Sequence, residues 1–183
     1  TIRAKMVKSI NLYNNFNIKT KDKRSIILIG NFDGLHLGHQ KLFTLAKKYK
    51  RKYSSKLGVL TFDPMPKMFF NSKIKKFKIS NQIQKMNLLS KLSVDFMILK
   101  KFNKKFSKTK SIDFIKNILV KKLNAKFIFV SNNFRFGNKR EGDVRQLIRY
   151  ENLYNYKIIK PKPLFIKKRI VSSSLIRNYL QKG

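Results

Sequence analysis

The stretch that decides the fold is Gly30-Asn31-Phe32-Asp33-Gly34-Leu35-His36-Leu37-Gly38-His39. It follows a short, continuously apolar run, residues 25–29, which is typical of a buried parallel strand. Residues 40–49 come after it, with apolar side chains recurring on one face of a helix. A glycine-rich turn from strand to helix exposes backbone N–H groups at the positive end of the helix dipole. The sequence therefore predicts a phosphate site at this turn.

The only two histidines of the chain, His36 and His39, stand three residues apart at the start of the predicted helix. Their imidazoles add hydrogen-bond donors to the phosphate site, and Gly38 lets the helix start approach the phosphate closely. The alternative is a pair of solvated loop histidines. The strand–turn–helix context favours the phosphate site over that alternative.

Apolar runs of strand length alternate with helical patterns along the chain. We predict strands at 25–29, 57–62, 96–99, 127–130 and 157–159, and helices at 38–53, 81–92, 111–123, 142–152 and 173–181. This alternation is typical of an α/β fold with a doubly wound, Rossmann-like parallel sheet. A ligand crevice is then expected at the carboxyl ends of the strands, facing the segments after residues 29 and 130.

The rest of the chain adds no second unit. Residues 6–12 indicate an additional strand and residues 13–23 a polar loop, and we find no internal repeat or linker. We therefore expect one domain over residues 1–183.

Composition excludes several classes of function. With no cysteine, the chain cannot use disulfides, thiolate metal sites or a cysteine nucleophile. It contains no run of about eighteen apolar residues, so we expect no membrane span. Residues 1–6 lack the apolar core of a signal peptide, which favours a cytoplasmic protein.

The formal net charge of +36 attracts polyanions without requiring a specific site. The lysines are scattered in pairs along every segment rather than gathered in one tail or helix. We therefore expect only non-specific contact with nucleic acid, and we favour compositional drift toward A+T-rich codons over a selected nucleic-acid surface.

The ten-residue stretch resembles the H-x-G-H signature of the nucleotidyltransferase superfamily. In its longer form, G-N-F-D-G-x-H-x-G-H, it is similar to the FAD synthetase (FMN adenylyltransferase) module of bacterial bifunctional riboflavin kinase/FAD synthetases. The resemblance covers nearly the whole chain. It implies transfer of the adenylyl group of ATP to FMN, giving FAD and pyrophosphate, with Mg²⁺ as cofactor.

The FMN phosphate is already anionic near neutral pH, so this reaction requires alignment and charge stabilisation rather than a general base. The resemblance implies that the two histidines donate to the triphosphate. The turn under the nucleotide would be formed by Gly30, Asn31, Phe32 and Gly38. For Asp33, we favour a capping role over contact with the metal ion.

A second segment, V-S-S-S-L-I-R at residues 171–177, resembles the family's I-S-S-T-x-I-R. The resemblance implies that Ser173 and Arg177 act on the phosphates and that Ser174 binds the nucleotide. Three serines before a helix are otherwise an ordinary cap. Ser174 replaces the family's threonine, and Ile170 stands where a basic residue is frequent, with Arg169 one step earlier.

Two further segments imply a flavin site. Residues 131–137 are similar to the family's G-x-[ND]-F-x-F-G, with Asn133 as its polar position toward the nucleotide and Phe136 against the flavin. For Phe134, we favour packing in the core. Residues 61–66 resemble T-F-x-P-x-P, in which two prolines predict a stiff, extended piece. By the resemblance, Pro64, Pro66 and Phe70 form the flavin wall; the alternative is a rigid loop over the core.

The resemblance also bears on domain content and partners. The family's C-terminal riboflavin kinase domain is expected to be absent from this chain, since few residues follow Arg177. We expect a monomer whose partners are the small molecules ATP and FMN. Two alternatives stay open: another small-molecule nucleotidyltransferase of the H-x-G-H superfamily, or a basic RNA-binding protein on the same scaffold.

Overall fold

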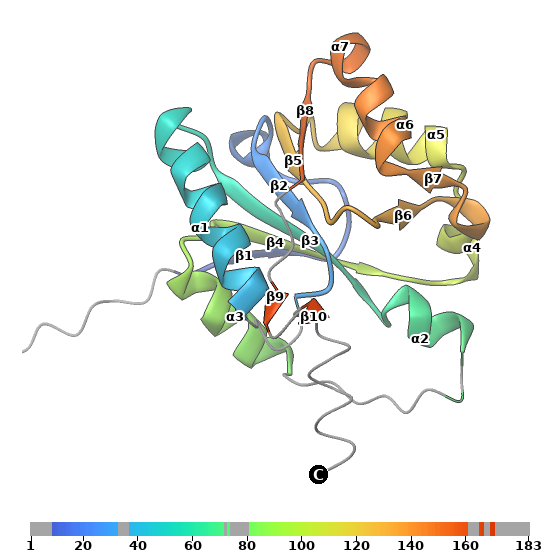
Figure 1. The fold of residues 1–183 in the computed structure, drawn as a ribbon, viewed down its shortest axis with the longest axis horizontal. Coiled ribbons are helices and arrows are strands. Elements are labelled where there is room, and N and C mark those ends of the chain that lie inside the picture. Colours follow the sequence, from blue (N-terminus) through green and yellow to red (C-terminus); the bar gives the residue numbers. More distant parts are fainter. Residues whose placement is uncertain are drawn as a thin grey trace, which may run out of the picture.

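The computed structural model describes residues 9–32, 37–71, 73, 81–160, 165–166 and 169–170, with backbone only for residues 37, 38 and those after 160. Six strands form a parallel sheet in the order β1-β4-β3-β2-β5-β8 (Figure 1). They are β1 (Asn11–Tyr13), β2 (Ile26–Ile29), β3 (Leu57–Asp63), β4 (Phe96–Lys101), β5 (Phe127–Phe129) and β8 (Lys157–Ile159). The predicted parallel α/β fold is confirmed.

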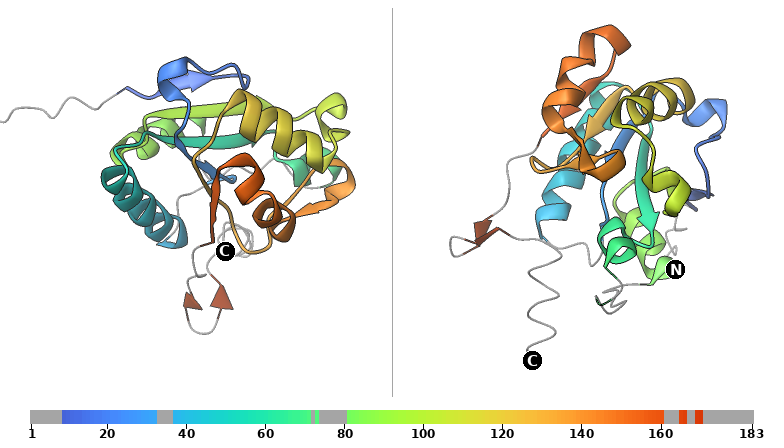
Figure 2. Two further views of the ribbon diagram at one scale, coloured as in Figure 1. Left: turned by 90° about the horizontal axis from the view of Figure 1, so that it is seen from above. Right: turned by 90° about the vertical axis from the view of Figure 1, so that its right-hand side faces the viewer.

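Helices cover both faces of this sheet (Figures 1 and 2). On one face lie α1 (Leu37–Lys52) and α3 (Gln82–Lys91). On the other face α5 (Ser111–Asp113) continues as the π-helix η2 (Phe114–Lys122), beside α6 (Val144–Arg149). Short elements complete the described chain: α2 (Pro66–Phe70), α4 (Lys104–Ser107), α7 (Glu151–Tyr154), η1 (Thr20–Asp22), η3 (Asn138–Arg140), β6 (Arg135–Phe136), β7 (Gly142–Asp143), β9 (Phe165–Ile166) and β10 (Arg169–Ile170).

Each face of the sheet has its own core. Side chains alternate along a strand, so Ile26 and Leu28 join the core under α1 and α3, while Ile27 and Ile29 join the core under η2 and α6. Both faces of β2 are therefore buried. The continuous apolar run that predicted a parallel strand at 25–29 reflects this double burial.

Two sequence expectations need correction. Residues 13–23 are not simply a polar loop, because Phe16 and Ile18 are buried and pack into the core under η2. The strand at this end is β1, which begins at Asn11, and residues 6–8 of the predicted strand lie outside the described residues. The predicted helix at 142–152 is also divided. Residues 142–143 form β7, and α6 begins only after Asp143, whose side chain accepts a hydrogen bond from the Gln146 N–H at 2.9 Å.

A buried carboxylate ties the first segment to the sheet. Asp22 is 1% exposed and accepts hydrogen bonds from the Tyr13 hydroxyl at 2.5 Å and the Lys56 ammonium at 2.7 Å. Burial alone would raise the pKa of Asp22, but the hydrogen bonds from Lys56 and Tyr13 outweigh it and hold this pKa below its ordinary value. The charged form of Asp22 is therefore the form that stabilises the fold.

This predicts how acid affects stability. Because the folded-state pKa of Asp22 lies below the unfolded value of about 3.9, its contribution is complete above that pH and is lost as the pH falls through the folded-state pKa. Asp22→Asn should lower the free energy of unfolding at pH 7 by about 1–3 kcal/mol. Urea unfolding from pH 6 downward should also show a shallower acid loss in this variant. Asp113→Asn is the control, and equal acid loss in Asp22→Asn and wild type would contradict the assignment.

Candidate functional site

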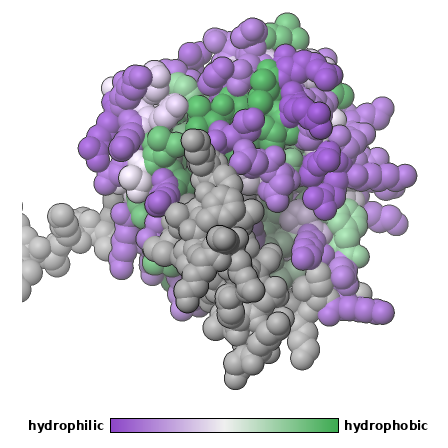
Figure 3. Space-filling model, in the orientation of Figure 1, coloured by the Kyte–Doolittle hydropathy of each residue, from purple (hydrophilic) through white to green (hydrophobic). Residues whose placement is uncertain are grey.

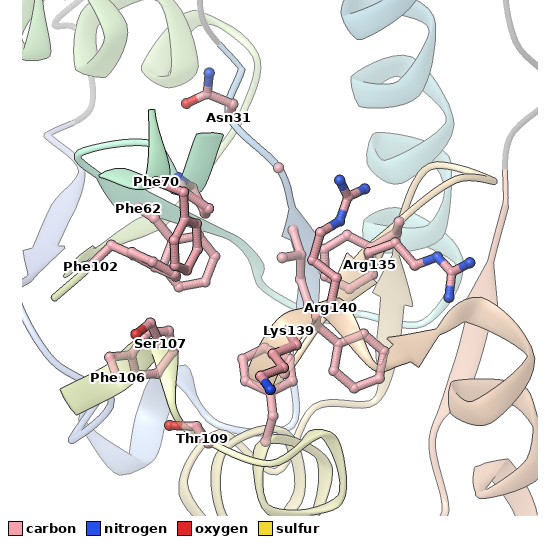
Figure 4. A pocket seen from close by; sticks show the side chains of 17 residues that line it. Asn31, Phe62, Phe70, Phe102, Phe106, Ser107, Thr109, Arg135, Lys139 and Arg140 are labelled. Carbon is pink, nitrogen blue, oxygen red and sulfur yellow. The ribbon is translucent and has the colours of Figure 1, made fainter. Parts of the chain in front are cut away.

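A pocket lies where the strand order reverses. The chain runs from β2 to β3 and β4 on one side, and then crosses to β5 on the other side of β2. Ligands bind at such a reversal in doubly wound sheets, at the carboxyl ends of the strands. Here a cavity of about 220 Å³ is lined by Gly30 and Asn31 after β2, and by residues 134–137 after β5 (Figure 4). The predicted meeting of these two segments is confirmed.

We call this cavity the aromatic pocket, because seven phenylalanines line it: Phe62, Phe70, Phe102, Phe106, Phe114, Phe134 and Phe136. The ring of Phe62 stacks on Phe106 with centroids 5.6 Å apart. Phe134 and Phe136, also in the lining, stack at 5.5 Å with planes 18° apart. Phe70 is 65% exposed, so a large apolar face is open to a ligand. Such walls suit a flat aromatic ring.

The charged part of the lining is basic. Arg135, Lys139 and Arg140 line the pocket, and Figure 4 shows both arginines across from Phe62 and Phe102. None of the described lining residues is an Asp or Glu. Lys139 and Arg140 are exposed and have positive φ angles of 50° and 60°, which non-glycine residues rarely adopt. The pocket therefore offers apolar walls to a ring and positive charge to an anion.

A clamp between two segments shapes this basic side. The Asn138 N–H donates to the Thr109 carbonyl at 2.7 Å, and the Ser111 N–H donates to Glu141 Oε1 at 2.7 Å. Gly137, with φ +78°, lies so close that a Cβ would stand 2.7 Å from the Ser111 backbone. These contacts hold the turn that carries Lys139 and Arg140 against the start of α5.

The turn between β2 and α1 is partly described. Phe32 is 3% exposed, has φ 45°, and packs its ring edge-on to Phe43 at 5.3 Å and His39 at 5.2 Å. His39 is half-buried in the first turn of α1. Gly38 belongs to the backbone of the same turn. His36 and Asp33 lie outside the described residues.

The structure brings five of the predicted site residues to the aromatic pocket: Gly30, Asn31, Pro66, Phe70 and Phe136. Pro64, Phe32, His39 and Asn133 are described but do not line it. Asn133 is exposed, and its Oδ1 accepts a hydrogen bond from the Ser131 hydroxyl at 2.9 Å. Ser173, Ser174 and Arg177 lie outside the described residues, as does the side chain of Arg169.

One predicted local feature was wrong. The segment with two prolines is not extended throughout, because Pro66 begins α2 after a cis Asp63–Pro64 peptide. Proline suits the first helical position, where its missing N–H and fixed φ cost nothing. The helix carries Phe70 to the pocket. The expected packing of Phe134 against the core is confirmed, and this half-buried ring also lines the pocket.

Sequence reasoning missed much of the pocket. Phe102, Phe106, Ser107, Thr109, Lys139 and Arg140 line it without belonging to a predicted binding position. One signal was available for the first four. Asn103 caps α4 by accepting a hydrogen bond from the Phe106 N–H at 2.8 Å. Asparagine is a common helix cap, and Asn103 follows the predicted strand at 96–99 by four positions, which indicates a turn near the carboxyl end of that strand.

Two other kinds of site are missing from the described part of the chain. No group of three or more His, Cys, Asp or Glu that could hold a metal ion occurs there. None of the helices described is long and apolar enough to cross a bilayer.

Comparison with known proteins shows the family of this chain. The sequence profile described as FAD synthetase matches residues 18–175. This chain belongs to the FAD synthetase family. Bifunctional riboflavin kinase/FMN adenylyltransferases are similar to it: that of Buchnera aphidicola (Acyrthosiphon pisum, strain APS) is 38% identical over 91% of this chain, and that of Escherichia coli K12 is 30% identical over 85%. The chain spans about half the length of these relatives, 53% and 50%.

Solved structures resemble this FAD synthetase-family chain as well. A crystal structure described as a macrolide-efflux protein from Streptococcus pneumoniae superimposes with a TM-score of 0.78 at 27% identity, covering 91% of this chain and 54% of that one. Pantothenate synthetase from Thermus thermophilus gives a TM-score of 0.55 at 10% identity, covering 91% and 67%, which shows a shared fold alone.

The clamp yields a stability prediction. Gly137→Ala should lower the free energy of unfolding by about 1–3 kcal/mol, because a Cβ at positive φ is strained and meets the Ser111 backbone. Urea unfolding measures the change. Asn132→Ala, at an exposed position before β6, should unfold like wild type. A wild-type midpoint for Gly137→Ala would show that the two segments are not clamped.

Proposed function

We propose that this chain transfers the adenylyl group of ATP to FMN, giving FAD and pyrophosphate. One observation carries the proposal: the aromatic pocket combines phenylalanine walls with a basic rim, formed by Arg135, Lys139 and Arg140. The pocket also reaches Asn31, which precedes α1 and its His39 in the chain. The flavin ring would lie between the phenylalanines, and its phosphate would face positive charge. Membership of the FAD synthetase family supports the same reaction.

The chemistry needs few protein groups. An FMN phosphate oxygen attacks the α-phosphorus of ATP in line, the new P–O bond forms, and the bond to the β-phosphate bridging oxygen breaks. Pyrophosphate leaves with the negative charge that develops in the transition state. We propose that His36 and His39 stabilise this charge by hydrogen bonding, together with Ser173 and Arg177. Asn133 and Ser174 would contact the nucleotide, and Gly30, Phe32 and Gly38 would shape its turn.

Mg²⁺ belongs to this proposal as the counter-ion of ATP. Among the described residues there is no group of three or more His, Cys, Asp or Glu that could hold a metal ion. Mg²⁺ is commonly bound through substrate phosphates and retained waters rather than by a protein cage. We therefore propose that it enters and leaves with the phosphates.

The basic surface carries a second, weaker expectation. Figure 3 shows hydrophilic side chains spread over the visible described face, in line with the scattered lysines. We propose that nucleic acid binds only non-specifically, with affinity that falls steeply as salt is raised. We also propose that the enzyme acts as a monomer in the cytoplasm, on small-molecule substrates.

The proposed function is tested by incubating the purified chain with ATP, Mg²⁺ and FMN and separating the flavins by chromatography. FAD should form together with pyrophosphate. Nicotinamide mononucleotide and phosphopantetheine serve as competing acceptors. Preference for either over FMN would assign the chain to another small-molecule nucleotidyltransferase and contradict the flavin reaction.

The histidines should matter for turnover. His36→Ala and His39→Ala should each lower kcat roughly a hundredfold, since each removes a donor from a site of developing charge. Thr44→Ala, an exposed position further along α1, is the matched control and should keep wild-type activity. Thermal unfolding monitors the fold of each variant. Near-wild-type rates for both histidine variants would contradict the phosphate-site assignment.

Phe70 should act on one substrate only. Phe70→Ala should weaken FMN binding by about 1–3 kcal/mol through lost stacking and burial, and should change ATP binding much less. Flavin fluorescence titration and ATP titration measure the two affinities. Leu153→Ala, which removes a side chain as exposed as Phe70 from α7, is the control. Equal losses for FMN and ATP would indicate general damage instead of a flavin wall.

A further inference from the structure

A lysine outside every predicted motif reaches the turn between the aromatic pocket and α1. Lys85 Nζ, on α3, donates a hydrogen bond to the main-chain oxygen of Asn31 at 2.9 Å. These residues are 54 positions apart in the sequence, so the contact depends on the tertiary fold. It brings a positive charge from α3 to the carboxyl end of β2.

The position of Lys85 on its helix is one where an apolar residue would be expected. Leu89, one helical turn later on the same side, is fully buried in the core under α1 and α3. Met86, the next residue, packs against that core as well. A half-buried ammonium here loses part of its hydration, and the Asn31 oxygen replaces it. A specific hydrogen bond to the Asn31 oxygen therefore contributes to holding the lysine at this turn.

Asn31, which Lys85 contacts, and the next residue, Phe32, belong to two neighbouring parts of the site. The Asn31 side chain lines the aromatic pocket, and its amide contacts the sulfur of Met65, next to Pro66. The next residue, Phe32, is held at positive φ and packs against His39. A change in the orientation of the 31–32 peptide would therefore move the pocket lining and the His39 support together.

We propose that Lys85 is a positioning residue for adenylyl transfer. Its hydrogen bond to Asn31 fixes the peptide between residues 31 and 32, so that a flavin in the aromatic pocket and a triphosphate at the start of α1 keep the alignment that in-line attack requires. The inference rests on the proposed function. Lys85 acts through Asn31 and Phe32, and its loss should therefore appear in turnover more than in substrate affinity.

The test compares three variants of the full chain in the FAD-forming assay. Lys85→Met keeps the aliphatic stem and removes the donor; its kcat should fall ten- to a hundredfold, since small misplacements of reacting groups cost up to about a hundredfold. The KM values for FMN and ATP should stay within about threefold of wild type. Lys85→Arg, which keeps a charged donor, should recover most of kcat. Lys91→Met, at an exposed position of the same helix, should match wild type.

The possible results separate this inference from the proposed function. Active wild type with equally active Lys85→Met would overturn the role of Lys85 alone, and a wild-type chain that makes no FAD would overturn both. A Lys85→Met chain that is unfolded at the assay temperature, by thermal unfolding, would assign Lys85 to stability and overturn the positioning role. Low kcat with an intact fold, near-normal KM values and rescue by arginine would establish it.

Discussion

The burial of β2 between β3 and β5 is the constraint on which the rest of the site depends. All four residues of this strand are at most 4% exposed, and both neighbours pair with it in parallel. Because this strand is buried on both faces and both edges, the polar segment that follows it leaves the sheet at the carboxyl end. Gly30, Asn31 and α1 follow there, so the position of the ligand pocket follows from the way this one strand is packed.

Much of this could be predicted from the sequence, for a physical reason. At 25–29, 57–62 and 96–99 apolar residues follow one another because both faces of the inner strands are covered. Burial on both faces favours apolar side chains at consecutive positions, and this pattern can be recognised in the sequence. The turn at Gly30–Phe32 was equally readable, because glycine beside a strand end marks a special backbone. Local patterns of this kind depend on near neighbours in the chain.

The pocket itself could be predicted only in part. The pocket lining joins residues from separate segments, among them Phe102, Phe106 and Lys139 with Phe62 and Phe136. No spacing in the sequence predicts that these segments come together. Lys85 is the clearest case, because among so many lysines nothing local distinguishes it. Pro66 shows a different difficulty. Its sequence pattern was recognised, but proline is accepted both at the start of a helix and in an extended chain. The tertiary context determines that Pro66 begins a helix here.

Two residues of the basic rim, Lys139 and Arg140, have positive φ angles, and this affects how the protein can evolve. Lys139 and Arg140 each carry a backbone cost of about 1 kcal/mol that glycine would not carry. Glycine at either position would relax the turn while removing positive charge from the aromatic pocket. At these two positions, selection for stability therefore favours glycine, whereas selection for ligand binding favours a basic residue.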